Sequence, residues 1–338
     1  MAARSSQPRT PLDSRHTDQG TYYYFIPSEA RNALIVVIGE FIGTLMFLLL
    51  AFIGAQTAIL TNAPGDPNAP KSPSALLYIA ASFGTSLAVN VWIFFRVSGG
   101  MFNPAVTLGL VLVGAVSPWR ALLIVPSQIA ASIAASALTF ALLPGNLSVA
   151  NTLGAQTNLT QGLFLEMFLT AQLVLTVYFL AVEKHRATYL APIGIGVSVF
   201  IAHMAGTNYT GTSINPARSI GPAIFVGFTS YHWIYWLGPV MGALLAFAVY
   251  TLLKWLDYRT ANPGQDADDI EMACRDGLAP LAPLMSGSRN IFTSDGIIKI
   301  STDNLPSLKD SRPTTRFGNR TLGPPTPHLN VRFSWNKE

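Results

Sequence analysis

Charged residues are scarce in this chain. Only 11% of its 338 residues are Asp, Glu, Lys or Arg, whereas half are hydrophobic. Soluble globular domains carry about 25% charged residues. The composition therefore excludes a large soluble catalytic domain and indicates an integral membrane protein. The chain also lacks the Gly-x-Ser-x-Gly and His-Glu-x-x-His patterns of hydrolases, so we expect no enzyme activity.

Cysteine is almost absent as well. The single cysteine, Cys274, lies outside the apolar part of the chain. One cysteine excludes an intramolecular disulfide and a cysteine-built metal site. We expect no metal and no other cofactor. Membrane lipids are expected partners, and nucleic acid is not.

Six apolar segments approach or exceed the roughly 20 residues that a membrane span requires. They cover 33–60, 75–95, 119–143, 163–182, 189–205 and 233–255. Two further apolar stretches, 104–113 and 216–226, are too short to cross a bilayer. Such stretches survive at membrane depth only where protein or a water-lined cavity surrounds them. We predict an all-α membrane protein with six transmembrane helices and two re-entrant half-helices.

Basic residues gather at one side of these spans. Arg31 precedes the first span, Arg120 and Lys184 lie in the second and fourth connections, and Lys254 closes the sixth span. The positive-inside rule then predicts that both termini are cytoplasmic. We divide the chain into an N-terminal segment 1–31, a membrane domain 32–256 and a tail 257–338. The tail is rich in Pro, Ser, Thr and Asp, which predicts disorder, although 297–300 could form a strand.

The tripeptide Asn-Pro-Ala occurs twice, once at the start of each short apolar stretch. The copies are Asn103, Pro104 and Ala105, and Asn215, Pro216 and Ala217. Asn is favoured as a helix cap and Pro at the first helical position, so each copy predicts a helix that begins inside the membrane. A helix start carries free N–H groups and partial positive charge. One copy in each half indicates an inverted repeat with its site near the midplane.

A second motif, Glu-x-x-x-Thr, also occurs once in each half. It begins at Glu40 in the first span and at Glu166 in the fourth. A charge at the bilayer centre costs about 2.5–3.5 kcal/mol, so both carboxylates need a role. We favour the interpretation that both carboxylates brace the re-entrant loops by accepting hydrogen bonds from their backbone. We expect Gln128 to have a similar bracing role. Proton relay or ion coupling is the alternative, but neither span contains a Lys or Arg to complete a relay.

The two loops resemble a known pair. Segment 98–107, Ser-Gly-Gly-Met-Phe-Asn-Pro-Ala-Val-Thr, and segment 211–219, Gly-Thr-Ser-Ile-Asn-Pro-Ala-Arg-Ser, closely resemble the signature loops of aquaporins. The resemblance covers about 32–256 and is strongest to fungal orthodox water channels. It implies a channel domain with an hourglass pore in each protomer, a homotetramer, water as the permeant and a location in the plasma membrane. Met101 departs from it, because many members have His there.

The resemblance also implies two constrictions. At the first, the amides of Asn103 and Asn215 donate to a passing water molecule. The second is an aromatic/arginine selectivity filter, whose positions match Phe83, His203, Thr212 and Arg218. Bulky side chains there favour water. Glycerol channels resemble this architecture but have Asp and Lys where this chain has Ser219 and Ala223.

Other interpretations remain open. A facilitator of glycerol or another small neutral solute would share the fold, and an ion-coupled carrier would need an ionisable pair. Tyr22, Tyr23 and Tyr24 precede the first span and form either an interfacial belt or an N-terminal plug that gates the pore. Asn146 and Asn158 begin Asn-x-Ser/Thr glycosylation patterns in the third connection, on the side predicted to be outside.

Overall fold

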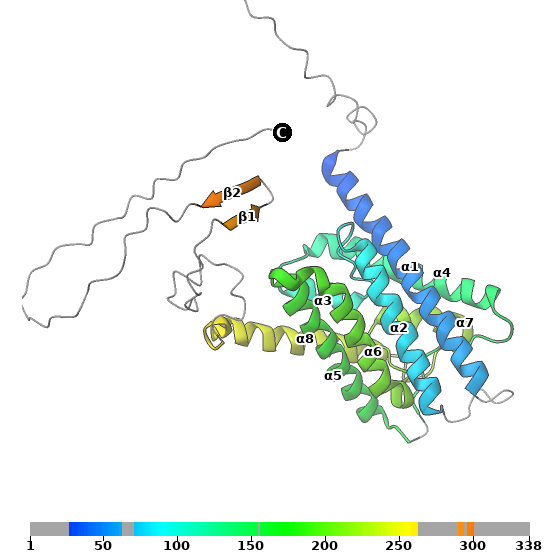
Figure 1. Cartoon of the computed structure of the whole chain (residues 1–338). Helices are drawn as coiled ribbons and strands as arrows, with labels where there is room; N and C mark the ends of the chain where they lie inside the picture. The colour runs from blue at the N-terminus through cyan, green and yellow to red at the C-terminus, as the bar shows by residue number, and fades with distance from the viewer. Residues whose placement is uncertain (1–26, 63–70, 155, 263–288, 294–295, 301–338) are drawn as a thin grey trace, which may run out of the picture. The chain divides into compact units, whose positions relative to one another are not determined.

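The computed structural model describes residues 27–62, 71–154, 156–262, 289–293 and 296–300. Its α-helices are α1 (Ser28–Asn62), α2 (Pro73–Phe94), α3 (Pro104–Leu112), α4 (Pro118–Leu142), α5 (Leu159–Val177), α6 (Ala191–Thr210), α7 (Pro216–Val226) and α8 (Ile234–Trp255) (Figure 1). Short helical turns follow α5, precede α6 and follow α8. They are η1 (Tyr178–Val182, π-helical), η2 (Arg186–Leu190) and η3 (Tyr258–Thr260).

Six helical segments are long and apolar enough to cross a membrane. They are Ser28–Asn62, Pro73–Phe94, Pro118–Leu142, Leu159–Val182, Ala187–Thr210 and Ile234–Trp255. The prediction of six spans and two half-helices is confirmed, since α3 and α7 start at the two tripeptides. The fifth span is longer than the predicted 189–205. Its last turn contains polar residues, Thr207 and Thr210, which are buried inside the bundle.

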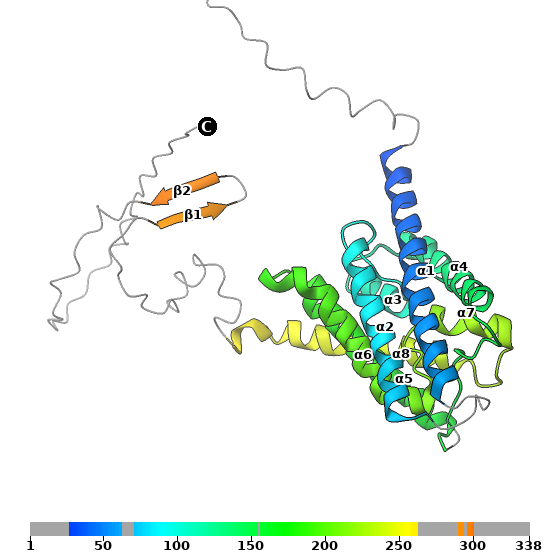
Figure 2. The same ribbon diagram turned by 45° about the vertical axis from the view of Figure 1, so that its right-hand side comes forward.

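The helices pack as two equivalent halves. In the first half α1 packs against α2 and α4, and in the second half α5 packs against α6 and α8. Figures 1 and 2 show α1 running beside α2. Each half-helix packs mainly against the last span of the other half, α3 against α8 and α7 against α4. The halves therefore interlock, and the two half-helices meet inside the bundle.

The halves also meet where α2 crosses α6. A Cβ atom on Gly84 would lie 2.8 Å from the Gly196 carbonyl oxygen, and one on Gly196 would lie 2.6 Å from the Gly84 carbonyl oxygen. Only glycine lets the two backbones approach this closely. This crossing places Phe83 of α2 against α6.

The remaining part of the chain forms a second unit within Ala279–Glu338. There β1 (Arg289–Thr293) and β2 (Gly296–Ile300) pair antiparallel, and β2 contains the strand suggested at 297–300. The described parts of the segment 257–338 are thus a 3-10 turn and a hairpin. Its assignment as a tail stays a prediction.

Candidate functional site

Each Asn-Pro-Ala tripeptide begins a half-helix. The Asn103 side chain accepts a hydrogen bond from the Ala105 amide at 2.8 Å, and the Asn215 side chain accepts one from the Ala217 amide at 3.0 Å. Each asparagine is thus the N-cap of its helix, α3 or α7. Pro104 and Pro216 follow the caps, at positions where a missing N–H leaves no bond unmade.

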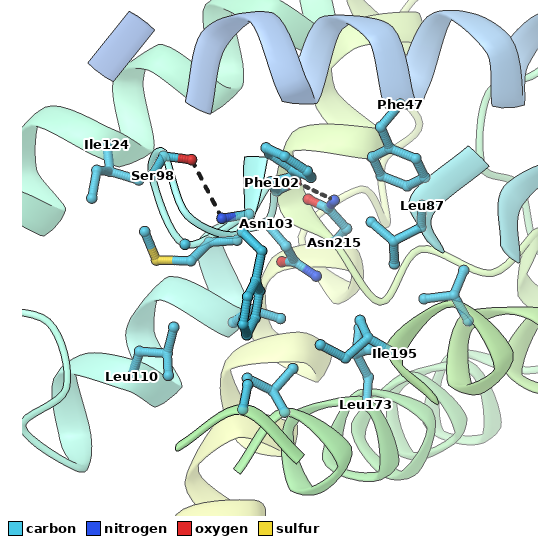
Figure 3. Close-up of a pocket in the computed structure, with 18 of the residues that line it drawn as sticks. Phe47, Leu87, Ser98, Phe102, Asn103, Leu110, Ile124, Leu173, Ile195 and Asn215 are labelled. Atoms are coloured by element: carbon cyan, nitrogen blue, oxygen red, sulfur yellow. Dashed lines mark hydrogen bonds between the residues drawn. The ribbon is translucent and has the colours of Figure 1, made fainter. Parts of the chain in front are cut away.

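The two helix starts are tied to each other. The Asn103 amide nitrogen donates to the Ile214 carbonyl at 2.8 Å. The Asn215 amide nitrogen donates to the Phe102 carbonyl at 2.9 Å (Figure 3). An amide nitrogen carries two hydrogens, so each asparagine keeps a second N–H. Both side chains line the same cavity. The site therefore offers two neighbouring donors to a molecule inside it.

The residue before each asparagine has a left-handed backbone. Phe102 has φ of 50° and Ile214 has φ of 47°. This conformation is unfavourable for bulky and β-branched residues and persists only where the surroundings fix the chain. The strained turns direct the two carbonyl groups at the opposite asparagines.

Buried carboxylates fix both turns. Glu40, on α1, accepts hydrogen bonds from the Met101 and Phe102 amides at 3.1 and 2.9 Å. It also accepts from the Ser98 hydroxyl at 2.7 Å and from the Gln128 amide at 2.9 Å. These donors saturate the carboxylate, which is the arrangement that loop bracing requires.

The second half repeats this arrangement. Glu166, on α5, accepts hydrogen bonds from the Ser213 and Ile214 amides at 2.8 and 2.7 Å, and from the Thr210 hydroxyl at 2.6 Å. Among the described residues, no Lys or Arg lies within salt-bridge distance of Glu40 or Glu166. The geometry favours bracing over proton relay, because backbone N–H groups do not exchange charge with a permeant.

The four residues proposed for the filter come together from three segments. The rings of Phe83 and His203 stack with centroids 3.9 Å apart and planes at 24°. The Arg218 guanidinium carbon lies 5.1 Å from the Phe83 ring centre. The Thr207 hydroxyl links His203 to Thr212. It lies 3.2 Å from a ring nitrogen of His203 and 3.2 Å from the Thr212 hydroxyl. The stacked rings leave no space between them, so any path passes along their edges.

One cavity contains the two asparagines and three of the four proposed filter residues, whereas Thr212 is fully buried and does not line it. The cavity has a volume of about 430 Å³, and its wall includes Asn103 and Asn215 together with Phe83, His203 and Arg218. Apolar side chains such as Leu110, Leu173 and Ile195 make up most of the remainder (Figure 3). Arg120 and Lys184 also line it, near the start of α4 and the end of η1. A mostly apolar cavity with a few convergent polar groups suits a small neutral molecule.

Comparison with known families agrees with this architecture. A family model described as Major intrinsic protein matches residues 29–250. The chain belongs to the major intrinsic protein family. It is a multi-pass integral membrane protein and an aquaporin-type channel rather than an enzyme.

Three curated relatives within the major intrinsic protein family are fungal aquaporins. The chain is 68% identical to Aquaporin-1 of Gibberella zeae over 241 residues, which are 71% of this chain and 76% of that protein. It is 47% identical to Aquaporin-7 of Botryotinia fuckeliana over 292 residues, 85% of this chain and 62% of that protein. It is 51% identical to Aquaporin-5 of the same fungus over 246 residues, which are 71% of this chain and 46% of that protein.

A solved structure has the same fold. The structure is that of the aquaglyceroporin from Plasmodium falciparum. It superposes with a TM-score of 0.58, covers 67% of this chain and 99% of its own, and is 20% identical in sequence. At this identity the likeness supports the fold alone.

Sequence reasoning missed two buried amides in this channel. Asn151, in the connection between α4 and α5, accepts hydrogen bonds from Arg218 at 2.7 Å and from Ser219 at 2.8 Å. Gln56, near the end of α1, bonds the same connection at Asn146 and Ser148. Gln56 could have been identified from the sequence, because it is an amide side chain within an apolar span. Nothing local marks Asn151, because its partners are distant in sequence.

The other predicted sites lie away from the cavity. Asn146 and Asn158 are both exposed in the connection between α4 and α5. The Asn158 side-chain oxygen caps α5 by accepting from the Gln161 amide at 2.9 Å, which leaves its nitrogen available. Glycosylation of either residue stays a prediction. Tyr22, Tyr23 and Tyr24 lie outside the described residues.

Proposed function

We propose that this aquaporin-type channel conducts water and excludes glycerol, protons and ions. One observation carries the proposal: a buried arginine, Arg218, stands beside the stacked pair Phe83 and His203 at the wall of the cavity that Asn103 and Asn215 also line. The names of the fungal relatives, all aquaporins, support it.

The residue types favour water over glycerol. His203 occupies space beside Phe83 with a planar ring that is buried and held by Thr207. A glycerol molecule needs that space for its carbon chain, whereas a water molecule needs only a donor and an acceptor. Ser219 and Ala223, which are also buried, add no charge beside Arg218.

Charge excludes protons and cations. The N-termini of α3 and α7 both point their partial positive charge into the cavity, and Arg218 adds a full positive charge. The second N–H groups of Asn103 and Asn215 would hold the oxygen of the central water. That water then cannot accept a hydrogen bond from its neighbours in the file, which interrupts proton transfer along it.

The arrangement in the cell is part of this proposal. We expect both termini in the cytoplasm, the filter toward the outside, and four copies in a homotetramer in the plasma membrane. Arg31, Arg120 and Lys184 on one side of the spans support that orientation. Phospholipids would surround the exposed apolar faces of the bundle.

Stopped-flow light scattering on proteoliposomes tests the proposed selectivity. Vesicles with the full chain should shrink much faster than protein-free vesicles of the same lipid in an impermeant osmolyte. In a glycerol gradient the same vesicles should shrink and then re-swell no faster than protein-free vesicles. Rapid re-swelling in glycerol would instead make the chain a facilitator of small neutral solutes.

A further inference from the structure

The guanidinium group of Arg218 is held from one side. Its Nη1 atom donates to the Val149 carbonyl at 2.9 Å and to the Asn151 side chain at 2.7 Å. Its Nη2 atom donates to the Gly211 carbonyl at 3.3 Å, and its Nε atom is buried with no hydrogen-bond partner among the described residues. The shortest of these bonds is the one to Asn151. Both Nη1 partners belong to the connection between α4 and α5, which is distant in sequence from Arg218.

Asn151 is the centre of a small network. Its side chain is 4% exposed, and its oxygen accepts from both Arg218 and the Ser219 hydroxyl, at 2.7 and 2.8 Å. Its nitrogen donates to the Thr210 carbonyl at 3.4 Å. Because an arginine can only donate, the Asn151 oxygen must face it. Both lone pairs of that oxygen are therefore in use, and the amide has one orientation.

The absence of charge on Asn151 is as important for the filter as its position. A carboxylate in the same place would hold Arg218 equally well, but it would cancel the positive charge at the filter. Among the described residues, no Asp or Glu lies within salt-bridge distance of Arg218. The nearest backbone partners are neutral carbonyl groups. Glu166 interacts with Arg218 electrostatically without an ion pair, and Asn151 adds no second negative charge beside the guanidinium.

We propose that Asn151 is a positioning and specificity-determining residue of this channel. It acts through Arg218: its oxygen fixes the guanidinium beside Phe83 and His203, and its neutrality preserves the positive charge that repels cations. This inference rests on the proposed water-channel function. It predicts that two different substitutions of Asn151 separate the effect of the position of Arg218 from the effect of its charge.

Asn151→Ala removes the acceptor and releases Arg218 from its shortest bond. The guanidinium then gains freedom to swing from the filter, and the opening widens. We expect the ratio of glycerol to water permeability to rise roughly tenfold, the factor for the loss of one charge-assisted hydrogen bond.

Asn151→Asp keeps the two acceptor contacts and loses only the 3.4 Å bond to the Thr210 carbonyl. Arg218 stays in place, so the glycerol-to-water ratio should remain that of the unchanged chain. The carboxylate compensates the guanidinium charge, so proton leak should rise severalfold. A pH-sensitive dye trapped inside the vesicles reports this leak.

Gln56→Leu is the matched control. Gln56 is buried like Asn151 and bonds the same connection, with its nitrogen 2.7 Å from the Asn146 carbonyl and its oxygen 2.8 Å from the Ser148 amide. These two partners do not include Arg218, whose guanidinium bonds Val149, Asn151 and Gly211 instead. If Asn151 only anchored the connection, Gln56→Leu would change the glycerol ratio as Asn151→Ala does.

The experiment uses the full chain and the three variants in proteoliposomes, at equal protein per vesicle. A raised glycerol ratio in Asn151→Ala and a raised proton leak at an unchanged glycerol ratio in Asn151→Asp, with Gln56→Leu unchanged in both measurements, support the proposal. It is overturned if Asn151→Ala keeps the original ratio, or if Gln56→Leu matches it. Should Asn151→Ala fail to assemble, an unchanged proton leak in Asn151→Asp would still overturn it. A failure of the proposed function is distinguishable, because the unchanged chain would then conduct no water or would conduct glycerol.

Discussion

At the scale of the residue, the buried carboxylates are the most constrained groups of this channel. Glu40 and Glu166 lie fully buried in helices that cross the membrane, and each accepts two backbone hydrogen bonds from a strained turn. A buried charge is tolerated only when hydrogen bonds replace its hydration. Loss of the negative charge should therefore loosen the turn that presents an asparagine to the cavity.

Glu166→Gln tests this role. The new amide nitrogen would face the Ser213 or Ile214 amide, so one donor would lose its acceptor. We expect a loss of about 1–3 kcal/mol of stability and a marked fall in water permeability. Thermal unfolding in detergent and stopped-flow measurements check both. Glu29→Gln, at an exposed position of α1, is the control and should change neither. Unaltered unfolding and permeability in Glu166→Gln would show that the carboxylate does not brace the turn.

His203→Ala tests the size of the filter. Removal of the ring opens the space beside Phe83 and breaks the bond to Thr207. Glycerol permeability should rise on the order of tenfold, because loss of bulk in a fitted site changes discrimination by at least this factor. Re-swelling of vesicles in glycerol measures the change. Met204→Ala, on the exposed side of the same helix, should conduct like the unchanged chain. Equal glycerol exclusion in His203→Ala would remove His203 from the filter.

Residue-scale prediction succeeded where the chain repeats itself. The paired tripeptides and paired glutamates pointed to the loops that the structure brings together at Asn103 and Asn215. It missed Asn151, since the bond to Arg218 joins positions 67 residues apart and depends on how the connection folds over α7. No spacing rule in the sequence expresses such a contact.

At the scale of the element, a polar cluster ties the end of α5 to the end of α8. Glu183, just after η1, accepts hydrogen bonds from Tyr250, from Lys254 at 2.9 Å and from Arg259. Burial alone would raise the pKa of Glu183, but these three donors outweigh it and lower the pKa from 4.5 to about 2. The connection after α5, whose Lys184 lines the cavity, is thereby anchored to α8 and η3.

Glu183→Gln tests the anchor. Its pKa is depressed in the folded state, so the stabilisation is complete above pH 4.5 and declines as the pH falls toward 2. Lys254 and Arg259 are 45% and 56% exposed, so water screens the pairs and we expect a loss of about 1–3 kcal/mol at neutral pH. Thermal unfolding of both proteins across this range should show the difference vanish near pH 2. Asp257→Asn, an exposed acid nearby, is the control. A difference that is constant with pH would contradict the ionic origin.

The helices could be predicted from the sequence because a membrane requires each span to be long enough and apolar enough to cross it. Apolar runs gave all six spans, and the tripeptides gave the starts of α3 and α7. The end of α6 was not predictable from hydropathy. Its last turn is polar, and it stays helical because Thr207 and Thr210 find partners at His203 and Glu166 inside the bundle.

At the scale of the whole molecule, the repeat builds one channel from two halves that are each incomplete. Each half-helix packs on the last span of the other half, and each asparagine bonds the loop of the other half. Neither half could place its helix start at the centre alone. The sequence repeat predicted this inversion, whereas tetramer formation and the cytoplasmic location of the termini stay proposals.

Removal of residues 1–25 tests the proposed gate at Tyr22, Tyr23 and Tyr24. If one tyrosine enters the inner mouth, the shortened chain should conduct water severalfold faster. Swelling of cells or vesicles at equal surface abundance measures this rate. Replacement of the three tyrosines with alanine in the full chain separates the side chains from the rest of the segment. Identical water permeation rates in the full chain, the shortened chain and the alanine variant would contradict the gate and favour the interfacial belt as the role of the tyrosines.

The central claim is that two opposed helix starts, capped by Asn103 and Asn215, meet inside the membrane and hold a single file of water. A density map of the channel in lipid, at a resolution that shows ordered water, tests it most directly. We predict a water molecule within hydrogen-bond distance of both asparagine amide nitrogens, in a file that continues past Arg218. A map in which the asparagines lie apart, or in which protein or lipid fills the cavity between them, would contradict the account.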